Sequence, residues 1–203
     1  MNPLVLASMT TEGRSMHQLP DASQWVGVIG SRKASPSEVA MARQLGARLA
    51  GQGRVVVSGL ALGIDGAAHE GALSVPGGLT VAILSTAPRF TEVVHPIAHW
   101  ALAERVVAQG ALLHPFTTPA DSPAQRRHRF LERDRLLAML VSTIVVVADV
   151  EPISGGTRWA AGAGLQRGIP VFRLDSHGVF HKNPVVRPSR VDWDVECTVV
   201  VDS

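Results

Sequence analysis

Three glycine-containing turns, each placed after a short apolar run, constrain most strongly what this chain can fold into. The runs end at Gly30, Val57 and Val147, and a helical segment follows each turn. Apolar runs of strand length that alternate with helical segments are typical of parallel sheets covered by helices on both faces. Because parallel strands end at the same edge of a sheet, the three turns are expected to meet at one site.

The predicted elements define an α/β protein. Strands are predicted at residues 25–30, 55–57, 79–84, 111–113, 143–147 and 170–173. Helices are predicted at residues 36–51, 64–73, 98–109, 129–140 and 155–166. Right-handed crossovers then give a doubly wound, mostly parallel sheet, which is an extended Rossmann-like fold in a single domain.

We expect this domain to span residues 25–174. Residues 1–24 show no clear periodicity and are expected to form an N-terminal extension. Residues 175–203 differ from the preceding chain in sequence pattern and are expected to form a C-terminal extension. An edge strand near residues 195–201 is one option there.

The composition favours a globular protein of the cytoplasm. Of 203 residues, 46% are hydrophobic and 18% are charged, and neither a signal peptide nor a membrane span is recognisable. The single cysteine, Cys197, excludes an intrachain disulfide. The formal net charge is only +2, so a nucleic-acid site has to be a local basic patch. An aromatic fraction of 4% leaves little material for stacking bases.

The first turn contains Gly30, Ser31, Arg32 and Lys33. A hydroxyl and two cations at a close backbone turn suit an anion, most often a phosphate. The alternative is a solvated turn with two surface cations. The turn matches neither the dinucleotide-binding fingerprint nor a Walker loop.

The second turn begins at Ser58 and Gly59, which let a ligand approach the backbone, and Gly63 permits a positive φ before the helix. Asp65 and His69 are four residues apart and therefore share one helix face. Asp65 is placed to cap the helix or to accept from a ribose hydroxyl. A catalytic pair is conceivable, but the favoured interpretation is that Asp65 caps the helix and His69 is a half-buried packing residue.

The third turn, Ser154–Thr157, places two hydroxyls and two glycines at a predicted helix N-terminus, which again suits a phosphate.

Residues 126–135 carry five arginines against two acids. Arg126, Arg129 and Arg133 share one helical face. A nucleic-acid contact and a solvated, salt-bridged helix face are both open. No metal site and no nucleophilic triad is predicted.

These motifs, in this order, resemble the DprA/Smf family of DNA-processing proteins. The matching segments are Ile29–Arg32, Ser58–Leu73, Phe130–Arg135 and Ser154–Thr157, of which the second is the most specific. The resemblance implies single-stranded DNA binding in a basic pocket at the strand ends, homodimerisation, and transfer of DNA to the RecA recombinase. A non-enzymatic role in DNA processing, recombination or DNA uptake is therefore expected.

The resemblance also implies roles for individual residues. Ser31, Arg32 and Lys33 would meet a DNA phosphate, Ser58 and Gly59 would shape the pocket floor, and Arg133 and Arg135 would line the strand path. The full candidate set for DNA or phosphate binding is Gly30, Ser31, Arg32, Lys33, Ser58, Gly59, Asp65, Arg129, Arg133, Arg135, Ser154, Gly155, Gly156 and Thr157.

The chain departs from the family pattern in three respects. Asp134 stands where the family usually has Asn between two arginines, and Ala87–Pro96 replaces the usual segment after the third strand. The helical domain and the winged helix that family members commonly carry do not fit in the extensions.

Two other functions stay open. One is a nucleotide-binding sensor or carrier module of the same superfamily, in which the pocket holds a nucleotide or a phosphate and no other cofactor. The other is a nucleotide phosphoribohydrolase. The chain has Ala160 where the third turn of such hydrolases carries a glutamate, which counts against this function because that carboxylate would activate water. Asp65, Asp149 or Glu151 could take its place.

Overall fold

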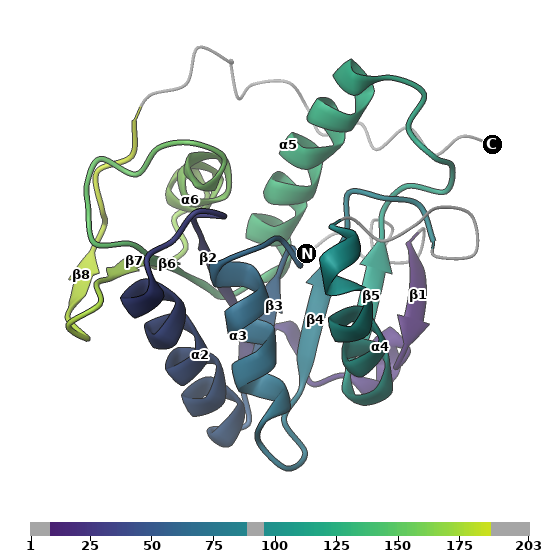
Figure 1. Cartoon of the computed structure of the whole chain (residues 1–203), viewed down its shortest axis with the longest axis horizontal. Helices are drawn as coiled ribbons and strands as arrows, with labels where there is room; N and C mark the ends of the chain where they lie inside the picture. The colour runs from purple at the N-terminus through teal and green to yellow at the C-terminus, as the bar shows by residue number, and fades with distance from the viewer. Residues whose placement is uncertain (1–8, 89–95, 188–203) are drawn as a thin grey trace.

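The computed structural model describes residues 9–88 and 96–187, and the rest of the chain is drawn in grey (Figure 1). One sheet contains the strands in the order β1-β5-β4-β3-β2-β6-β7-β8. The strands are β1 (Thr10–Gly13), β2 (Trp25–Gly30), β3 (Val55–Ser58), β4 (Thr80–Ile83), β5 (Ala111–His114), β6 (Thr143–Val147), β7 (Val171–Leu174) and β8 (Phe180–Lys182). The two edge strands β1 and β8 pair antiparallel, and the strands between them pair parallel. The predicted doubly wound, mostly parallel α/β fold is confirmed.

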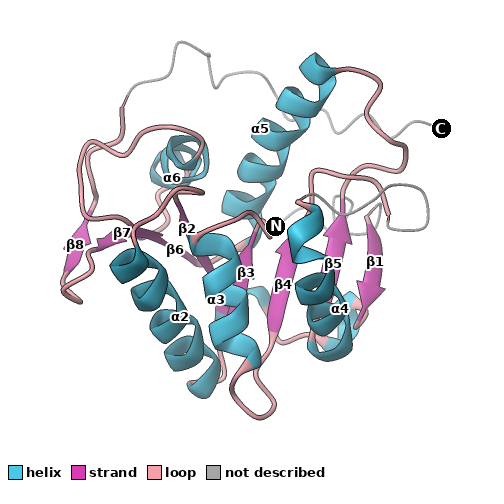
Figure 2. Cartoon of the chain, in the orientation of Figure 1, coloured by secondary structure: helices cyan, strands magenta, loops and turns pink. Residues whose placement is uncertain are grey.

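Helices cover both faces of the sheet (Figure 2). They are α2 (Pro36–Gly51), α3 (Ile64–Leu73), α4 (Trp100–Gln109), α5 (Pro123–Leu140) and α6 (Thr157–Gln166). Alternate residues of β2 explain why both faces need cover. Val26 and Val28 belong to the apolar cluster formed with α2 and α3, whereas Trp25 and Ile29 belong to the cluster formed with α5 and α6. A central parallel strand is therefore apolar on both sides.

The chain reverses direction across the sheet at β2. From β2 it runs outward through β3, β4 and β5, and α5 then returns it to β6 on the other side of β2. Ligands of such sheets bind where this reversal separates the loops at the strand ends. The first and third turns flank this switch point.

Three helix starts differ from the predicted ones, and one of them is that of α6, which begins at Thr157 rather than at residue 155. Helix α5 begins at Pro123, six residues earlier than expected, because the Ser122 hydroxyl caps it by accepting from the Gln125 N–H (3.1 Å). Helix α4 begins at Trp100, because a short 3₁₀ turn, Ile97–His99, precedes it. Helix α2 begins at Pro36 as predicted, and a capping box formed by Ser35 and Glu38 fixes this start.

The sheet extends beyond residues 25–174 at both ends, since β1 pairs with β5 and β8 pairs with β7. The edge strand considered near residues 195–201 lies outside the described residues. Within residues 9–88 and 96–187, no helix is both long and apolar enough to cross a membrane.

Candidate functional site

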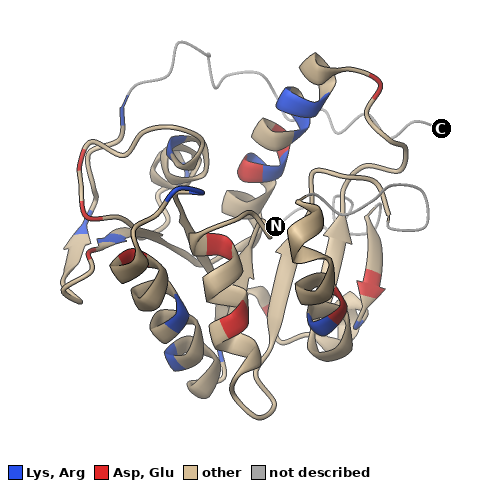
Figure 3. Ribbon diagram, in the orientation of Figure 1, with Lys and Arg blue, Asp and Glu red and all other residues tan. Residues whose placement is uncertain are grey.

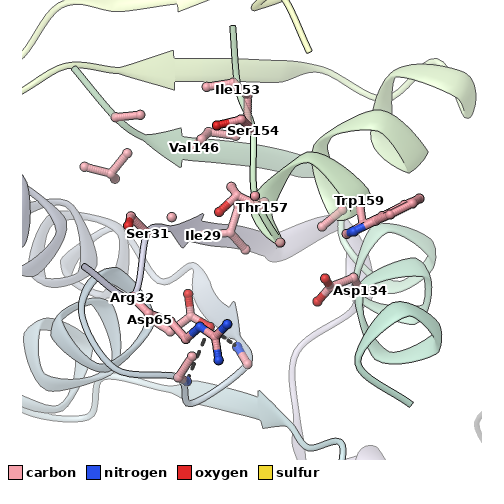
Figure 4. Close-up of a pocket in the computed structure, with 18 of the residues that line it drawn as sticks. Ile29, Ser31, Arg32, Asp65, Asp134, Val146, Ile153, Ser154, Thr157 and Trp159 are labelled. Atoms are coloured by element: carbon pink, nitrogen blue, oxygen red, sulfur yellow. Dashed lines mark hydrogen bonds between the residues drawn. The ribbon is translucent and has the colours of Figure 1, made fainter. Parts of the chain in front are cut away.

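A pocket with a volume of about 1010 Å³ lies at the switch point and is lined by parts of all three turns. Side chains from β2, from the segment before α6 and from α5 surround it (Figure 4). Most of the candidate set lines it: Gly30, Ser31, Arg32, Lys33, Gly59, Asp65, Arg133, Ser154, Gly155, Gly156 and Thr157. The predicted meeting of the three turns at one site is therefore observed.

The first turn is held against helix α3 at very short range. A Cβ on Gly30 would lie 2.4 Å from Ile64 Cγ1 and 2.8 Å from the Val147 carbonyl oxygen. A Cβ on Gly63, which has φ +76°, would lie equally close to the Ser31 carbonyl oxygen. This oxygen accepts from the Ile64 N–H (3.3 Å). Only residues without a Cβ fit this approach, and φ at Gly63 also favours glycine. The approach fixes the first turn beside the second.

Arg32 and Lys33 are exposed at the mouth of the pocket, and neither makes an ion pair with another described residue. The Ser31 hydroxyl accepts from the Lys33 N–H (3.0 Å), which shapes the turn. A hydroxyl and two exposed cations at a strand end remain a suitable arrangement for a phosphate.

The second turn contributes a buried charge cluster. Asp65 Oδ2 accepts from the N–H groups of Gly59 (3.1 Å) and Ala61 (3.4 Å) and lies 3.9 Å from Arg133 Nη1. The expectation that Asp65 caps α3 is therefore wrong: the N-cap is Gly63, and the carboxylate instead satisfies the loop that precedes the helix. Burial raises the pKa of Asp65, although Arg133 and these two N–H groups oppose the effect.

Asp134 adds a second carboxylate to Arg133. Its Oδ1 lies 2.9 Å from Arg133 Nε, and its side chain is 15% exposed. Burial raises the pKa of Asp134 to about 6. The charge of Asp65 adds to this rise, whereas Arg133 and Arg32 oppose it.

The third turn leads into α6 without a side-chain cap. Ser154, Gly155 and Gly156 are exposed, and a Cβ at either glycine would meet nothing within 4 Å. The first N–H groups of a helix lack partners inside the helix, so the start of α6 can bind an anion. The loop that leads from β6 to this turn is joined to α2, because Glu38 Oε1 accepts from the Asp149 N–H (3.0 Å).

Three candidate residues do not line the pocket. The Ser58 hydroxyl is buried and donates to the Val28 carbonyl (2.6 Å), so it joins β3 to β2. Arg129 is buried, donates to the Thr118 carbonyl (2.6 Å) and stacks on the Phe116 ring at 4.6 Å. Arg135 is half-buried and is not among the residues that line the pocket.

His69 is fully buried rather than half-buried. Its Nδ1 lies 2.7 Å from Thr80 Oγ1. Burial lowers the pKa of His69 to about 3, and the nearby His99 adds to the effect. A histidine that stays neutral and sealed from the pocket makes no catalytic pair with Asp65, so its interpretation as a packing residue is confirmed.

Several lining residues were not singled out from the sequence. They are apolar or aromatic side chains brought in from separate elements: Ile29, Phe130, Val146, Ile153 and Trp159. Two of them had a sequence signal, since Ile29 and Phe130 each begin a segment that resembles the family. In the described part of the chain, no cluster of His, Cys, Asp or Glu could hold a metal ion.

The fold and this site define a Rossmann-like α/β protein with a ligand pocket at its topological switch point. The family model of DNA recombination-mediator protein A matches residues 12–183, and the chain belongs to this family, the DprA/Smf proteins. The resemblance noted in the sequence is thereby confirmed.

Individual relatives differ in how far they match. A DprA DNA-processing protein of Mycobacterium tuberculosis is 40% identical over 142 residues, which cover 70% of this chain and 34% of that protein. The chain thus spans about a third of the length of this relative. The DprA structure from Streptococcus pneumoniae superimposes with a TM-score of 0.66 at 26% identity, over 85% of this chain and 59% of that one.

A DprA structure from Helicobacter pylori superimposes with a TM-score of 0.68 at 23% identity, over 82% of this chain and 71% of that one. At this identity the likeness shows the fold alone. That structure is described as revealing the single-stranded DNA binding mode of the H. pylori protein.

Proposed function

We propose that this chain is a cytoplasmic single-stranded DNA-binding protein of DNA processing and recombination, which holds the strand by phosphate contacts at the pocket. One observation carries the proposal: three turns suited to anions meet at the switch point, with Arg32 and Lys33 exposed at the mouth. Membership of the DprA/Smf family and the DNA binding of the H. pylori relative support it.

The basic residues offer a path for a strand beyond the pocket. Arg127 lines the pocket and Arg126 is exposed one residue before it, near the start of α5. The basic residues of α5 and those of the turn after β2 lie toward the same end of the sheet (Figure 3). Phosphates of one strand could therefore contact both.

The proposal includes two partners beyond DNA. We propose that the chain hands the bound strand to RecA and that it acts as a homodimer. Family membership supports both.

The test is fluorescence anisotropy with a labelled dT oligonucleotide at low and at moderate salt. We expect binding that weakens with salt and that Arg32→Glu reduces at least tenfold, because a phosphate contact becomes a repulsion. Arg48→Glu is the matched control. It makes the same charge change at an exposed position of α2, about 18 Å along the helix from Pro36. Equal affinities of Arg32→Glu and the wild type would refute the proposal.

A second function has its own support: a sensor or carrier of a nucleotide or another small phosphorylated molecule. The pocket is lined by Ile29, Val146, Phe130 and Trp159, and pockets for small ligands are mostly apolar with a few convergent polar groups. A thermal shift produced by nucleoside phosphates and absent with oligonucleotides would select this function.

A nucleotide hydrolase has less support. Ala160 lines the pocket and offers no carboxylate, while Asp65 is occupied by two backbone N–H groups and Arg133. Release of free base from nucleoside monophosphates, abolished by Asp65→Asn, would revive it.

A further inference from the structure

One guanidinium in the pocket faces two carboxylates. Arg133 Nε lies 2.9 Å from Asp134 Oδ1, and Arg133 Nη1 lies 3.9 Å from Asp65 Oδ2. The side chains of Arg133, Asp134 and Asp65 are only 9%, 15% and 8% exposed, so water screens their charges weakly. With both carboxylates ionised, this cluster carries a net negative charge in a site proposed to bind phosphates.

The two carboxylates are not held equally. Asp65 accepts from the N–H groups of Gly59 and Ala61, whereas no hydrogen bond to Asp134 is present among the described residues. The Arg133 Nε–H likewise makes no hydrogen bond, although Asp134 Oδ1 is close, so charge alone holds this pair. Asp134 is therefore the carboxylate whose ionised form is the less stabilised.

Charged groups reach this region from every neighbouring element. They are Arg127 and Arg133 on α5, Asp65 on α3, Arg32 and Lys33 after β2, Glu38 on α2, Asp149 after β6, and Arg158 at the start of α6. Four of the described lining residues are basic (Arg32, Lys33, Arg127, Arg133) and four are acidic (Glu38, Asp65, Asp134, Asp149), and no histidine is among them. Loss of one negative charge therefore turns a balanced pocket into a basic one.

We propose that Asp134 determines the affinity of this pocket for nucleic acid: its carboxylate neutralises Arg133 and repels an incoming phosphate, and uptake of a proton by Asp134 releases Arg133 to the ligand. The inference rests on the proposed function and assigns it a proton dependence. Because the pKa of Asp134 lies near 6, its ionised carboxylate opposes phosphate binding at pH 7.5. Mild acid protonates it and removes this opposition.

The size of the effect follows from linkage. A charge within about 4–6 Å shifts a carboxyl pKa by about one unit or more, so a bound phosphate favours protonated Asp134 by that amount. Proton uptake then strengthens binding about fivefold or more between pH 7.5 and pH 5.5.

The experiment measures the Kd of a labelled dT oligonucleotide at pH 7.5 and 5.5 and constant ionic strength. We expect the wild type to bind about fivefold more tightly, or better, at pH 5.5. Asp134→Asn should bind tightly at both pH values. Asp121→Asn, an equal charge change on an exposed residue before α5, should keep the wild-type ratio. Equal pH ratios for the wild type and Asp134→Asn would overturn the inference.

Failure of the proposed function gives a different result. If the oligonucleotide binds at neither pH, the same comparison is made with inorganic pyrophosphate by calorimetry. A ratio shared by the wild type and Asp134→Asn, or no binding by either, then overturns the inference. Should Asp134→Asn not fold, NMR titration of the Asp134 carboxyl carbon decides. Its pKa should rise when ligand is added, and an unchanged pKa would contradict the mechanism.

Discussion

At the scale of single residues, the position of Arg133 depends on a missing side chain. A Cβ on Gly59 would lie 1.1 Å from Arg133 Nη1 and 3.0 Å from Asp65 Oδ2. The guanidinium therefore lies directly over the backbone of the second turn, between two carboxylates. The glycine was predicted to let a ligand come close to the backbone. In this structure the group that comes close is the chain's own arginine.

Asp134→Asn should stabilise the fold at alkaline pH. The pKa of Asp134 is raised to about 6, so the folded state binds a proton that the unfolded state, with a pKa near 3.8, has lost. The ionised carboxyl therefore costs stability above about pH 6, and this cost disappears as the pH falls below about 4. We expect Asp134→Asn to raise the free energy of unfolding by about 1–3 kcal/mol at pH 8.

Urea denaturation between pH 4 and pH 8 measures this difference. Asp121→Asn, where no burial is removed, serves as the control and should stay within about 0.5 kcal/mol of the wild type. A wild-type free energy of unfolding equal to that of Asp134→Asn at pH 8 would mean that Asp134 ionises without cost.

At the scale of elements, Gly30 sets the distance between β2, β6 and α3. Gly30→Ala should destabilise the protein by about 1–3 kcal/mol, because the new Cβ would press on Ile64 and on the backbone oxygen of Val147, which cannot move cheaply. Gly51→Ala is the matched control, since a Cβ there meets nothing within 4 Å. Thermal unfolding of both variants decides, and equal melting temperatures would contradict the close approach.

Ser58→Ala separates structure from binding. The buried hydroxyl joins β3 to the Val28 carbonyl of β2, so its loss should cost about 1–3 kcal/mol. Because Ser58 does not line the pocket, the Kd for the oligonucleotide should change less than about twofold. A large loss of affinity without loss of stability would restore Ser58 to the binding site.

The elements also show which parts of the fold could be predicted from the sequence. Strands such as Thr143–Val147 and the start of α2 at Ser35 have strong local signals, namely an apolar run and a capping box. Strands β1 and β8 are short and only partly buried, so their side chains carry no apolar pattern. They are identified only in the structure, by their pairing at the two edges of the sheet. The first two turns of α5 are polar, and only Ser122 followed by Pro123 marked its start.

The cluster of Asp65, Arg133 and Asp134 could not be predicted from the sequence, for a different reason. Asp65 and Arg133 are far apart in the chain, and their contact depends on how α5 crosses the sheet relative to α3. The sequence placed Arg133 with Arg126 on one helix face, but it contains no signal that Arg133 is buried and Arg126 is exposed.

At the scale of the whole molecule, the fold brings loops from opposite halves of the sheet to one pocket at the centre. Among the described residues, four basic and four acidic side chains line it, so its balance of charge, rather than the net charge of +2, governs its response to anions. A strand of DNA would meet Arg32 and Lys33 at the mouth, where neither pairs with another described residue, and the neutralised Arg133 inside.

The salt dependence of oligonucleotide binding is the most direct test of the proposed contact between Arg32 and a phosphate of single-stranded DNA. We expect log K to fall linearly with log salt, and Arg32→Ala to lower the magnitude of the slope by about 0.7, the amount for one phosphate contact of a single strand. Arg48→Ala should leave the slope unchanged. A salt-independent affinity, or equal slopes for Arg32→Ala and the wild type, would show that this pocket does not hold the DNA backbone.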